Sequence, residues 1–169
     1  MIRGEILLSN SLTYLEIEEV IKEQTDFLIG LVERIEDNLK GILGNRISNE
    51  NFGNSQIRNL LQAAKSASGV KEIKLFIQYQ MGRETKPNDY KWRRSTNGIT
   101  LGDAVIDCLD KIEKKVAEIF DPETKNYRVL LIRMMERFFL YMSWKYRYLA
   151  VQSEGSQKNQ SRPKAKNRR

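Results

Sequence analysis

Histidine is absent from this 169-residue chain, and cysteine occurs once, as Cys108. Without histidine there is no Ser-His or Cys-His nucleophile, no histidine metal ligand and no imidazole general base. A single cysteine forms no internal disulfide, and the pattern AVIDCLDKI places Cys108 on the apolar side of a helix, as a buried and inert thiol. We therefore expect no enzymatic reaction, no metal and no cofactor.

Long apolar runs are also missing. The longest, FFLYM at 138–142, lies inside an amphipathic pattern and is too short to cross a membrane. The first residues, MIRGEILLSN, carry an arginine and a glutamate around a very short apolar stretch, which makes a poor secretory signal. We expect a cytoplasmic protein without membrane contact, and one domain at this length.

Charge is distributed unevenly along the chain. Residues 1–50 hold five Lys/Arg and ten Asp/Glu, residues 51–151 hold eighteen and eleven, and residues 152–169 hold six and one. The sum is the net charge of +7. An acidic first part followed by a basic body is the asymmetry expected when one side of a molecule faces an anion, so a polyanion is the leading partner.

Hydrophobic periodicity is helical nearly throughout, and no segment alternates as a strand does. We predict an all-α, single-domain bundle of about five helices over residues 1–151, followed by a disordered basic tail at 152–169. The predicted helices span roughly 12–40, 54–68, 70–83, 100–120 and 122–150.

Local signals set these boundaries. Thr13 with Glu16 has the spacing of a capping box, and Gly30 is a weak point inside the first helix. Thr100 with Asp103 opens the fourth helix, and Asp121 caps the fifth, with a proline at its first position. Residues 84–99 have no period and form a loop long enough to be either functional or disordered.

The stretch NSQIRNLLQAAK at 54–65 carries two stripes. Its apolar residues follow the spacing of one buried helix face, while Arg58, Gln62 and Lys65 form a second stripe away from it. Lys71, Lys74 and Arg83 extend the basic set onto the next helix, where Arg83 also suits a helix C-terminus. The stripe is either a solvated surface or a track for phosphates.

Two further basic regions flank the helices. The loop sequence KWRRS at 91–95 interleaves Trp92 with Arg93 and Arg94, a pattern that suits single-stranded nucleic acid or a solvated loop. The tail adds either sequence-independent phosphate affinity or solubility. Its cations include Arg162, Lys164, Lys166, Arg168 and Arg169.

The predicted last helix has an unusual outer side. Its core face is Leu130, Leu131, Met134, Met135, Phe138, Tyr141, Met142 and Leu149, and its outer side is Arg133, Glu136, Arg137, Leu140, Trp144 and Arg147. Tryptophan beside arginines is the composition of a binding interface. The alternative is that the bundle covers this helix on both sides, with Trp144 in the core.

Three segments together resemble a known family. NSQIRNLL at 54–61, IQYQMGR at 77–83 and the aromatic helix RFFLYMSWKY at 137–146 look like the small α-helical subunit of type III-A CRISPR effector complexes, the Csm complexes. The resemblance covers roughly residues 50–150. The loop 84–99 and the basic tail are outside the family pattern, which leaves open a divergent type III subtype or the related Cmr complexes.

The resemblance implies a non-catalytic subunit of a ribonucleoprotein for antiviral defence. Such subunits stack in several copies beside other CRISPR effector subunits, and they contact the backbones of the guide RNA and the target RNA while base pairing supplies specificity. Arg58 and Arg83 match the family motifs. From charge and helix face we add Lys65, Arg93, Arg94, Arg133 and Arg137 as RNA-binding candidates.

Two other classes of protein fit the same features. A helical DNA-binding regulator would use a helix-turn-helix that reads base edges, and Ser68-Gly69 does join two short predicted helices. A helical adaptor would bind protein through the side of the last helix that carries Arg133 and Trp144, and would not bind nucleic acid.

Overall fold

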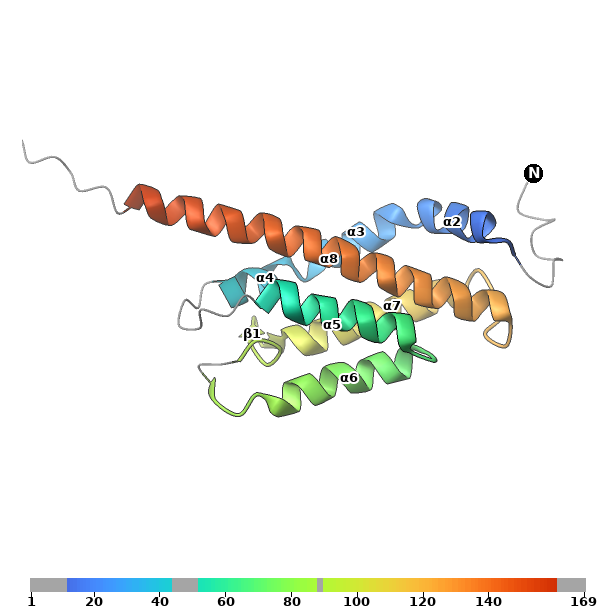
Figure 1. Ribbon diagram of the computed structural model, residues 1–169, viewed down its shortest axis with the longest axis horizontal. Helices are drawn as coiled ribbons and strands as arrows, with labels where there is room; N and C mark the ends of the chain where they lie inside the picture. The colour runs from blue at the N-terminus through green and yellow to red at the C-terminus, as the bar shows by residue number, and fades with distance from the viewer. Residues whose placement is uncertain (1–11, 44–51, 88–89, 161–169) are drawn as a thin grey trace, which may run out of the picture.

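The computed structural model describes residues 12–43, 52–87 and 90–160, which confirm the all-α class (Figure 1). Within these residues there are seven helices, where the sequence predicts about five. They are α2 (Tyr14–Glu23), α3 (Thr25–Arg34), α4 (Glu36–Leu43), α5 (Phe52–Ser66), α6 (Val70–Arg83), α7 (Leu101–Ala117) and α8 (Lys125–Gln160). A two-stranded hairpin, β1 (Ser95–Thr96) and β2 (Ile99–Thr100), precedes α7.

The predicted first helix is divided into α2, α3 and α4. The capping box is confirmed, because the Thr13 hydroxyl accepts the Glu16 N–H at 3.3 Å and the Glu16 carboxylate accepts the Thr13 N–H at 2.7 Å. The breaks fall at Gln24 and Ile35 and not at Gly30. At both breaks the N–H bonds to the carbonyl three residues earlier, a tighter turn that bends the chain.

These bends let the acidic segment follow α8. All three short helices contact α8, and each buries its own apolar residues against the core. A straight helix would leave one end without that contact. The observed division is therefore a response to packing that the amphipathic pattern alone does not encode.

The next pair of helices follows the prediction closely. The bounds of α6 are those predicted, whereas α5 begins at Phe52 and ends at Ser66, slightly before the predicted positions at both ends. The turn between them is fixed by the Ser68 N–H, which donates to the Glu72 carboxylate at 2.8 Å. The residues between the first two predicted helices, 41–53, lie mostly outside the described residues.

The segment after α6 is a loop, as predicted, but it contains a short hairpin and a core residue. Asn97 and Gly98 both have positive φ, 54° and 82°, the conformation of a tight hairpin turn. Trp92 is only 1% exposed, and its carbonyl accepts the Gly102 N–H at 2.9 Å. The suggestion that Trp92 stacks on nucleic-acid bases is therefore wrong, because its ring fills the core.

The last two helices form the centre of the molecule. Thr100 caps α7 as predicted, and Cys108 is buried on its inner face. The Thr124 hydroxyl accepts the Tyr127 N–H at 3.2 Å, so α8 begins at Lys125, and Asp121 belongs to the preceding turn instead of capping the helix. α8 contacts α2, α3, α4, α5 and α7, and buried residues of all the helices form one cluster.

The C-terminal end of α8 is longer than predicted. The helix continues to Gln160, beyond the expected end near Ala150, and projects past the other helices (Figure 1). Residues 151–160 include no proline, so nothing in this stretch of the sequence forces the helix to stop. The remaining tail, 161–169, and its cations lie outside the described residues.

Candidate nucleic-acid interface

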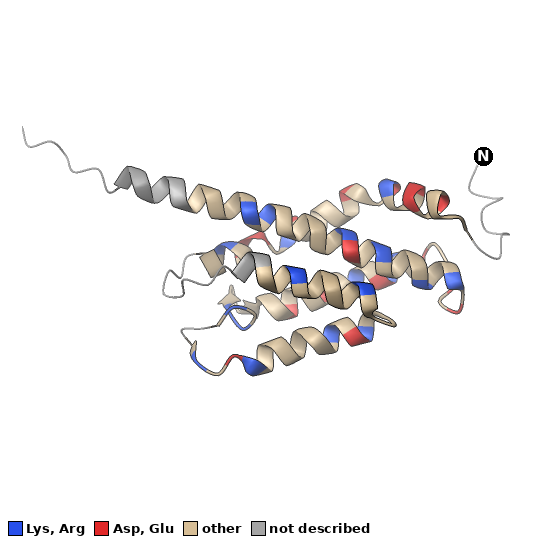
Figure 2. Cartoon of the chain, viewed as in Figure 1, with Lys and Arg blue, Asp and Glu red and all other residues tan. Residues whose placement is uncertain are grey.

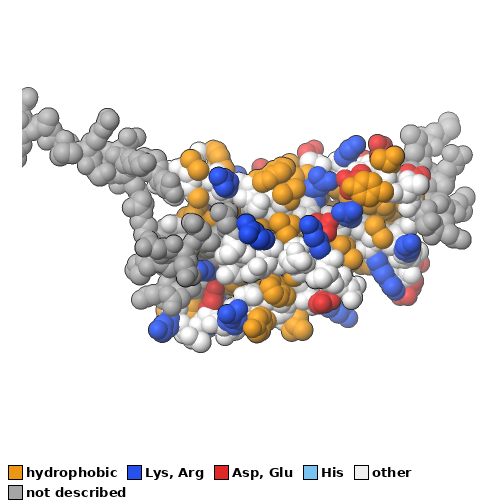
Figure 3. All heavy atoms as spheres, viewed as in Figure 1, with side chains coloured by type: hydrophobic (Ala, Val, Ile, Leu, Met, Phe, Trp, Pro, Cys, Tyr) orange, Lys and Arg blue, Asp and Glu red, His pale blue; other side chains and the backbone are white. Residues whose placement is uncertain are grey.

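The helices α5, α6 and α8 form one face of the molecule, and this face is basic. Figure 3 shows Lys and Arg side chains spread across it, with fewer Asp and Glu side chains between them. The contrast with α2 is clear in Figure 2, where acidic residues follow one another along that helix. α5 has two cations and no Asp or Glu, so no carboxylate on that helix competes with a phosphate.

The two cations of α5, Arg58 and Lys65, lie where the helical period predicts. Ile57, Leu60 and Ala64 are buried, while Arg58 and Lys65 are exposed two turns apart, about 10.5 Å along the helix axis. Among the described residues, no carboxylate forms an ion pair with either cation. Both charges are therefore available to an anion from outside.

The cations of α6 differ in their availability. Arg83 is exposed at the end of the helix, and its guanidinium carbon lies 5.7 Å from the centre of the Tyr79 ring. Lys74 is not part of a phosphate track, because its ammonium binds the Asp110 carboxylate and lies 3.4 Å from Glu113. Burial acts to lower the pKa of Lys74, but the hydrogen bond and charge of Asp110 raise it above its ordinary value of 10.5.

The two loop arginines are held within the loop. The Arg93 guanidinium lies 4.6 Å from the centre of the Tyr90 ring, and one of its nitrogens donates to the Glu84 carbonyl at 3.0 Å. Arg94 is half-buried, and its backbone joins Lys91 to the first residue of α7. The contacts of Arg93 hold its side chain against the loop, and neither arginine belongs to the α5 surface.

The α8 arginines have acidic or aromatic partners in their own fold. Arg133 donates to Glu136 at 3.1 Å and lies 5.2 Å from the centre of the Tyr14 ring. Arg137 donates to Glu18 at 2.8 Å. The structure thus places the predicted RNA-binding residues in three groups. In the described chain those on α5 and α6 form no carboxylate ion pair, the loop arginine Arg93 is held by a backbone carbonyl and a tyrosine ring, and each α8 arginine is paired with a glutamate.

Exposed apolar side chains mark the distal part of α8. Trp144 is 60% exposed, so the alternative that places it in the core is wrong. Its ring lies 5.5 Å from that of Tyr141, and Tyr148 and Val151 continue the exposed row along the helix. This row is compatible with a protein interface.

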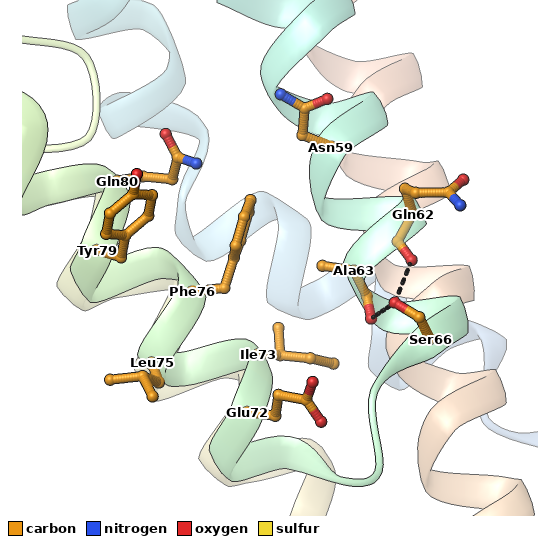
Figure 4. Close-up of a pocket in the computed structure, with 10 residues that line it drawn as sticks. All are labelled: Asn59, Gln62, Ala63, Ser66, Glu72, Ile73, Leu75, Phe76, Tyr79 and Gln80. Carbon is orange, nitrogen blue, oxygen red and sulfur yellow. Dashed lines mark hydrogen bonds between the residues drawn. The ribbon is translucent and has the colours of Figure 1, made fainter.

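A groove between α5 and α6 was not predicted. It has a volume of about 770 Å³. Its walls are drawn in Figure 4 and consist of Asn59, Gln62, Ala63, Ser66, Glu72, Ile73, Leu75, Phe76, Tyr79 and Gln80. The sequence does contain a signal for this groove, because α6 has more apolar residues than its buried stripe needs. Leu75 and Tyr79 fall outside that stripe and are exposed.

Other kinds of site find no support in the described residues. They contain no group of three or more cysteine, aspartate or glutamate side chains placed to hold a metal ion. Burial raises the pKa of the Cys108 thiol to about 12, which keeps it protonated and unreactive at neutral pH. Over the same residues, no helix combines the length and apolar character needed to cross a membrane.

Comparisons of the chain with protein-family models, curated proteins and solved structures find no match. The residues of the interface and the motif resemblance in α5, α6 and α8 are therefore the basis for a functional proposal. Arg58 and Arg83 are the two positions where both lines of argument meet.

Proposed function

We propose that this protein is a non-catalytic small subunit of a type III CRISPR ribonucleoprotein, in which it contacts the backbones of guide RNA and target RNA. The observation that carries the proposal is the Arg58 and Lys65 pair on α5, exposed and without a carboxylate partner among the described residues. RNA phosphates would supply the negative charges that α5 itself lacks, since this helix contains no Asp or Glu. The choice of assembly depends on the NSQIRNLL, IQYQMGR and RFFLYMSWKY segments, which resemble the small subunit of Csm complexes.

The structure of the interface suits a backbone contact more than a base-reading one. Arg58 and Lys65 stand on a rigid helix that packs against α8, so their spacing is fixed before RNA arrives. Guide-directed complexes leave sequence specificity to base pairing, and their proteins need only hold the strands. Arg83 extends the contact surface at the end of α6.

The salt dependence of RNA binding tests the proposal. For a single-stranded RNA, log affinity should fall linearly with log salt, with a slope of about −0.7 for each phosphate neutralised. Arg58→Glu and Lys65→Glu should each lower affinity and make the slope less steep. Lys22→Glu is the matched control, since it makes the same charge change on acidic α2, where its ammonium is exposed and lies 3.9 Å from Glu19.

The outcomes separate the rival functions. Equal affinities for wild type, Arg58→Glu and Lys22→Glu, with helicity preserved by circular dichroism, would exclude the α5 contact. Strong preference for one duplex DNA sequence would favour a DNA-binding regulator. Absence of RNA binding at any salt concentration would favour an adaptor, and the exposed row at Trp144 and Tyr148 supports that second candidate.

A further inference from the structure

We infer that the groove between α5 and α6 receives unpaired bases of a single-stranded RNA whose phosphates lie on the neighbouring Arg58 and Lys65. This inference rests on the proposed function and adds to it a second subsite with different chemistry. The two subsites are adjacent, because Gln62 belongs to the stripe between Arg58 and Lys65 and also lines the groove. A strand that crosses α5 can therefore contact both.

The apolar part of the groove suits the flat faces of bases. Figure 4 shows the Phe76 ring in the space between α5 and α6. Ile73 and Ala63 lie near this ring and also line the groove. Tyr79, on the outer side of α6, is 59% exposed. Bases stack on such rings irrespective of sequence, and Arg83 beside Tyr79 adds a cation for the adjacent phosphate.

The polar part of the groove contains an amide without a partner. Gln80 is only 9% exposed, yet within the described residues its side chain forms no hydrogen bond. Asn38 and Asn126, the other buried amides, each have one: Asn38 donates to Ile99, and Asn126 accepts from Leu12. A buried amide without a partner is costly to the fold, so its presence at a groove indicates a ligand with hydrogen-bonding edges.

The amide side chains in the lining, together with the cations Arg58 and Lys65 beside the groove, favour a nucleic acid over an apolar peptide helix. The carboxylate in the lining, Glu72, already accepts the Ser68 N–H at 2.8 Å, where it fixes the turn before α6. Asn59, Gln62 and Gln80 present donors and acceptors of the kind that bases offer on their Watson–Crick edges. Those edges are exposed only in a single strand, because pairing occupies them in a duplex.

The test uses two RNA strands of equal length, one with all its bases and one with abasic positions in the middle. Fluorescence anisotropy with the full chain measures their affinities. The wild type should bind the base-containing strand at least about fivefold more tightly, because stacking contributes on that order for each base. A fully paired duplex should bind more weakly than the base-containing strand.

Two variants locate the effect. Tyr79→Ala and Gln80→Leu should each remove most of the preference for the base-containing strand and leave the affinity for the abasic strand unchanged. Gln80→Leu replaces a buried amide with an apolar side chain of similar size, so it should keep or raise the unfolding midpoint. Tyr14→Ala is the control, because Tyr14 is also an exposed tyrosine but lies on acidic α2, and this variant should leave the preference intact.

The two proposals fail in different ways. Equal binding of both strands by the wild type, with weaker binding of both by Arg58→Glu, would overturn the groove inference and leave the phosphate contact in place. Absence of any RNA binding would overturn both. Unchanged RNA affinity in Tyr79→Ala, together with loss of a protein that co-purifies with the wild type, would show that the groove binds protein and would overturn the inference.

Discussion

The Arg137 guanidinium donates to the Glu18 carboxylate at 2.8 Å and so joins α8 to α2 across 119 residues of sequence. The side chains of this pair are 35% and 18% exposed, which places the bond at the edge of the core. A residue that the sequence suggests as an RNA ligand is therefore part of the fold. The same is true of Arg133, which bonds to Glu136 and lies over Tyr14.

Stability measurements should reveal this bond. In a double-mutant cycle with Arg137→Ala and Glu18→Ala, we expect a coupling free energy of about 1 kcal/mol, the upper part of the range for ion pairs near a surface. Urea unfolding supplies the four free energies. In RNA binding, Arg137→Ala should have a smaller effect than Arg58→Ala, and the reverse order would place the RNA contact on α8 instead of α5.

The two tryptophans should respond differently to truncation. Trp92 is almost fully buried, so Trp92→Ala should lower the free energy of unfolding by about 3–5 kcal/mol. Trp144 is mostly exposed, and Trp144→Ala should stay within about 1 kcal/mol of wild type. Urea unfolding followed by circular dichroism measures both, since it does not depend on tryptophan fluorescence.

Acrylamide quenching of the single-tryptophan variants is an independent check. The variant that keeps Trp92 should resist quenching, and the variant that keeps Trp144 should be quenched readily. The opposite pattern would mean that the loop is open in solution, and would restore Trp92 as a base-stacking candidate.

Acid should weaken one contact between α4 and α8. The Glu36 carboxylate lies 2.5 Å from the Lys145 ammonium and 2.7 Å from that of Lys40. The hydrogen bond from Lys145, followed by that from Lys40, lowers the pKa of Glu36 below its ordinary value of 4.5. A folded-state pKa below the unfolded value gives stability that is present above pH 4.5 and is lost as pH falls through the folded-state pKa.

The variant Glu36→Gln isolates this effect. Its free energy of unfolding should be lower than that of wild type at neutral pH, and the difference should shrink once the pH falls below 4.5. Glu19→Gln is the control, because Glu19 is exposed and lies 3.9 Å from Lys22. A Glu36→Gln difference that persists unchanged in acid would show that the carboxylate acts through packing and not through its charge.

Features that depend on neighbouring residues were predictable from the sequence. The capping hydroxyls of Thr13 and Thr100, the bounds of α6 and the burial of Cys108 all follow from spacing within one or two helical turns. The breaks at Gln24 and Ile35 did not follow, because they arise from the way α2–α4 bend along α8. Packing across the bundle is a long-range property that periodicity does not contain.

The same distinction applies to the candidate interface. Exposure of Arg58 and Lys65 follows from the helical period, since the buried residues of α5 fix the direction of the others. Other features do not follow from the period. Lys74 of α6 pairs with Asp110 of α7, which is 36 residues away in the sequence, and the burial of Trp92 depends on how the loop meets α7. A list of basic residues therefore names candidates, and the contacts of each one decide which are available.

Purification of the tagged chain from its own cells, with sequencing of the retained RNA and mass spectrometry of the proteins, tests the central claim most directly. The wild type should recover repeat-derived guide RNAs with larger CRISPR subunits, and the Arg58→Glu/Lys65→Glu variant should recover less RNA per subunit. Recovery of protein partners without RNA, or of an RNA yield that the variant does not change, would contradict the account.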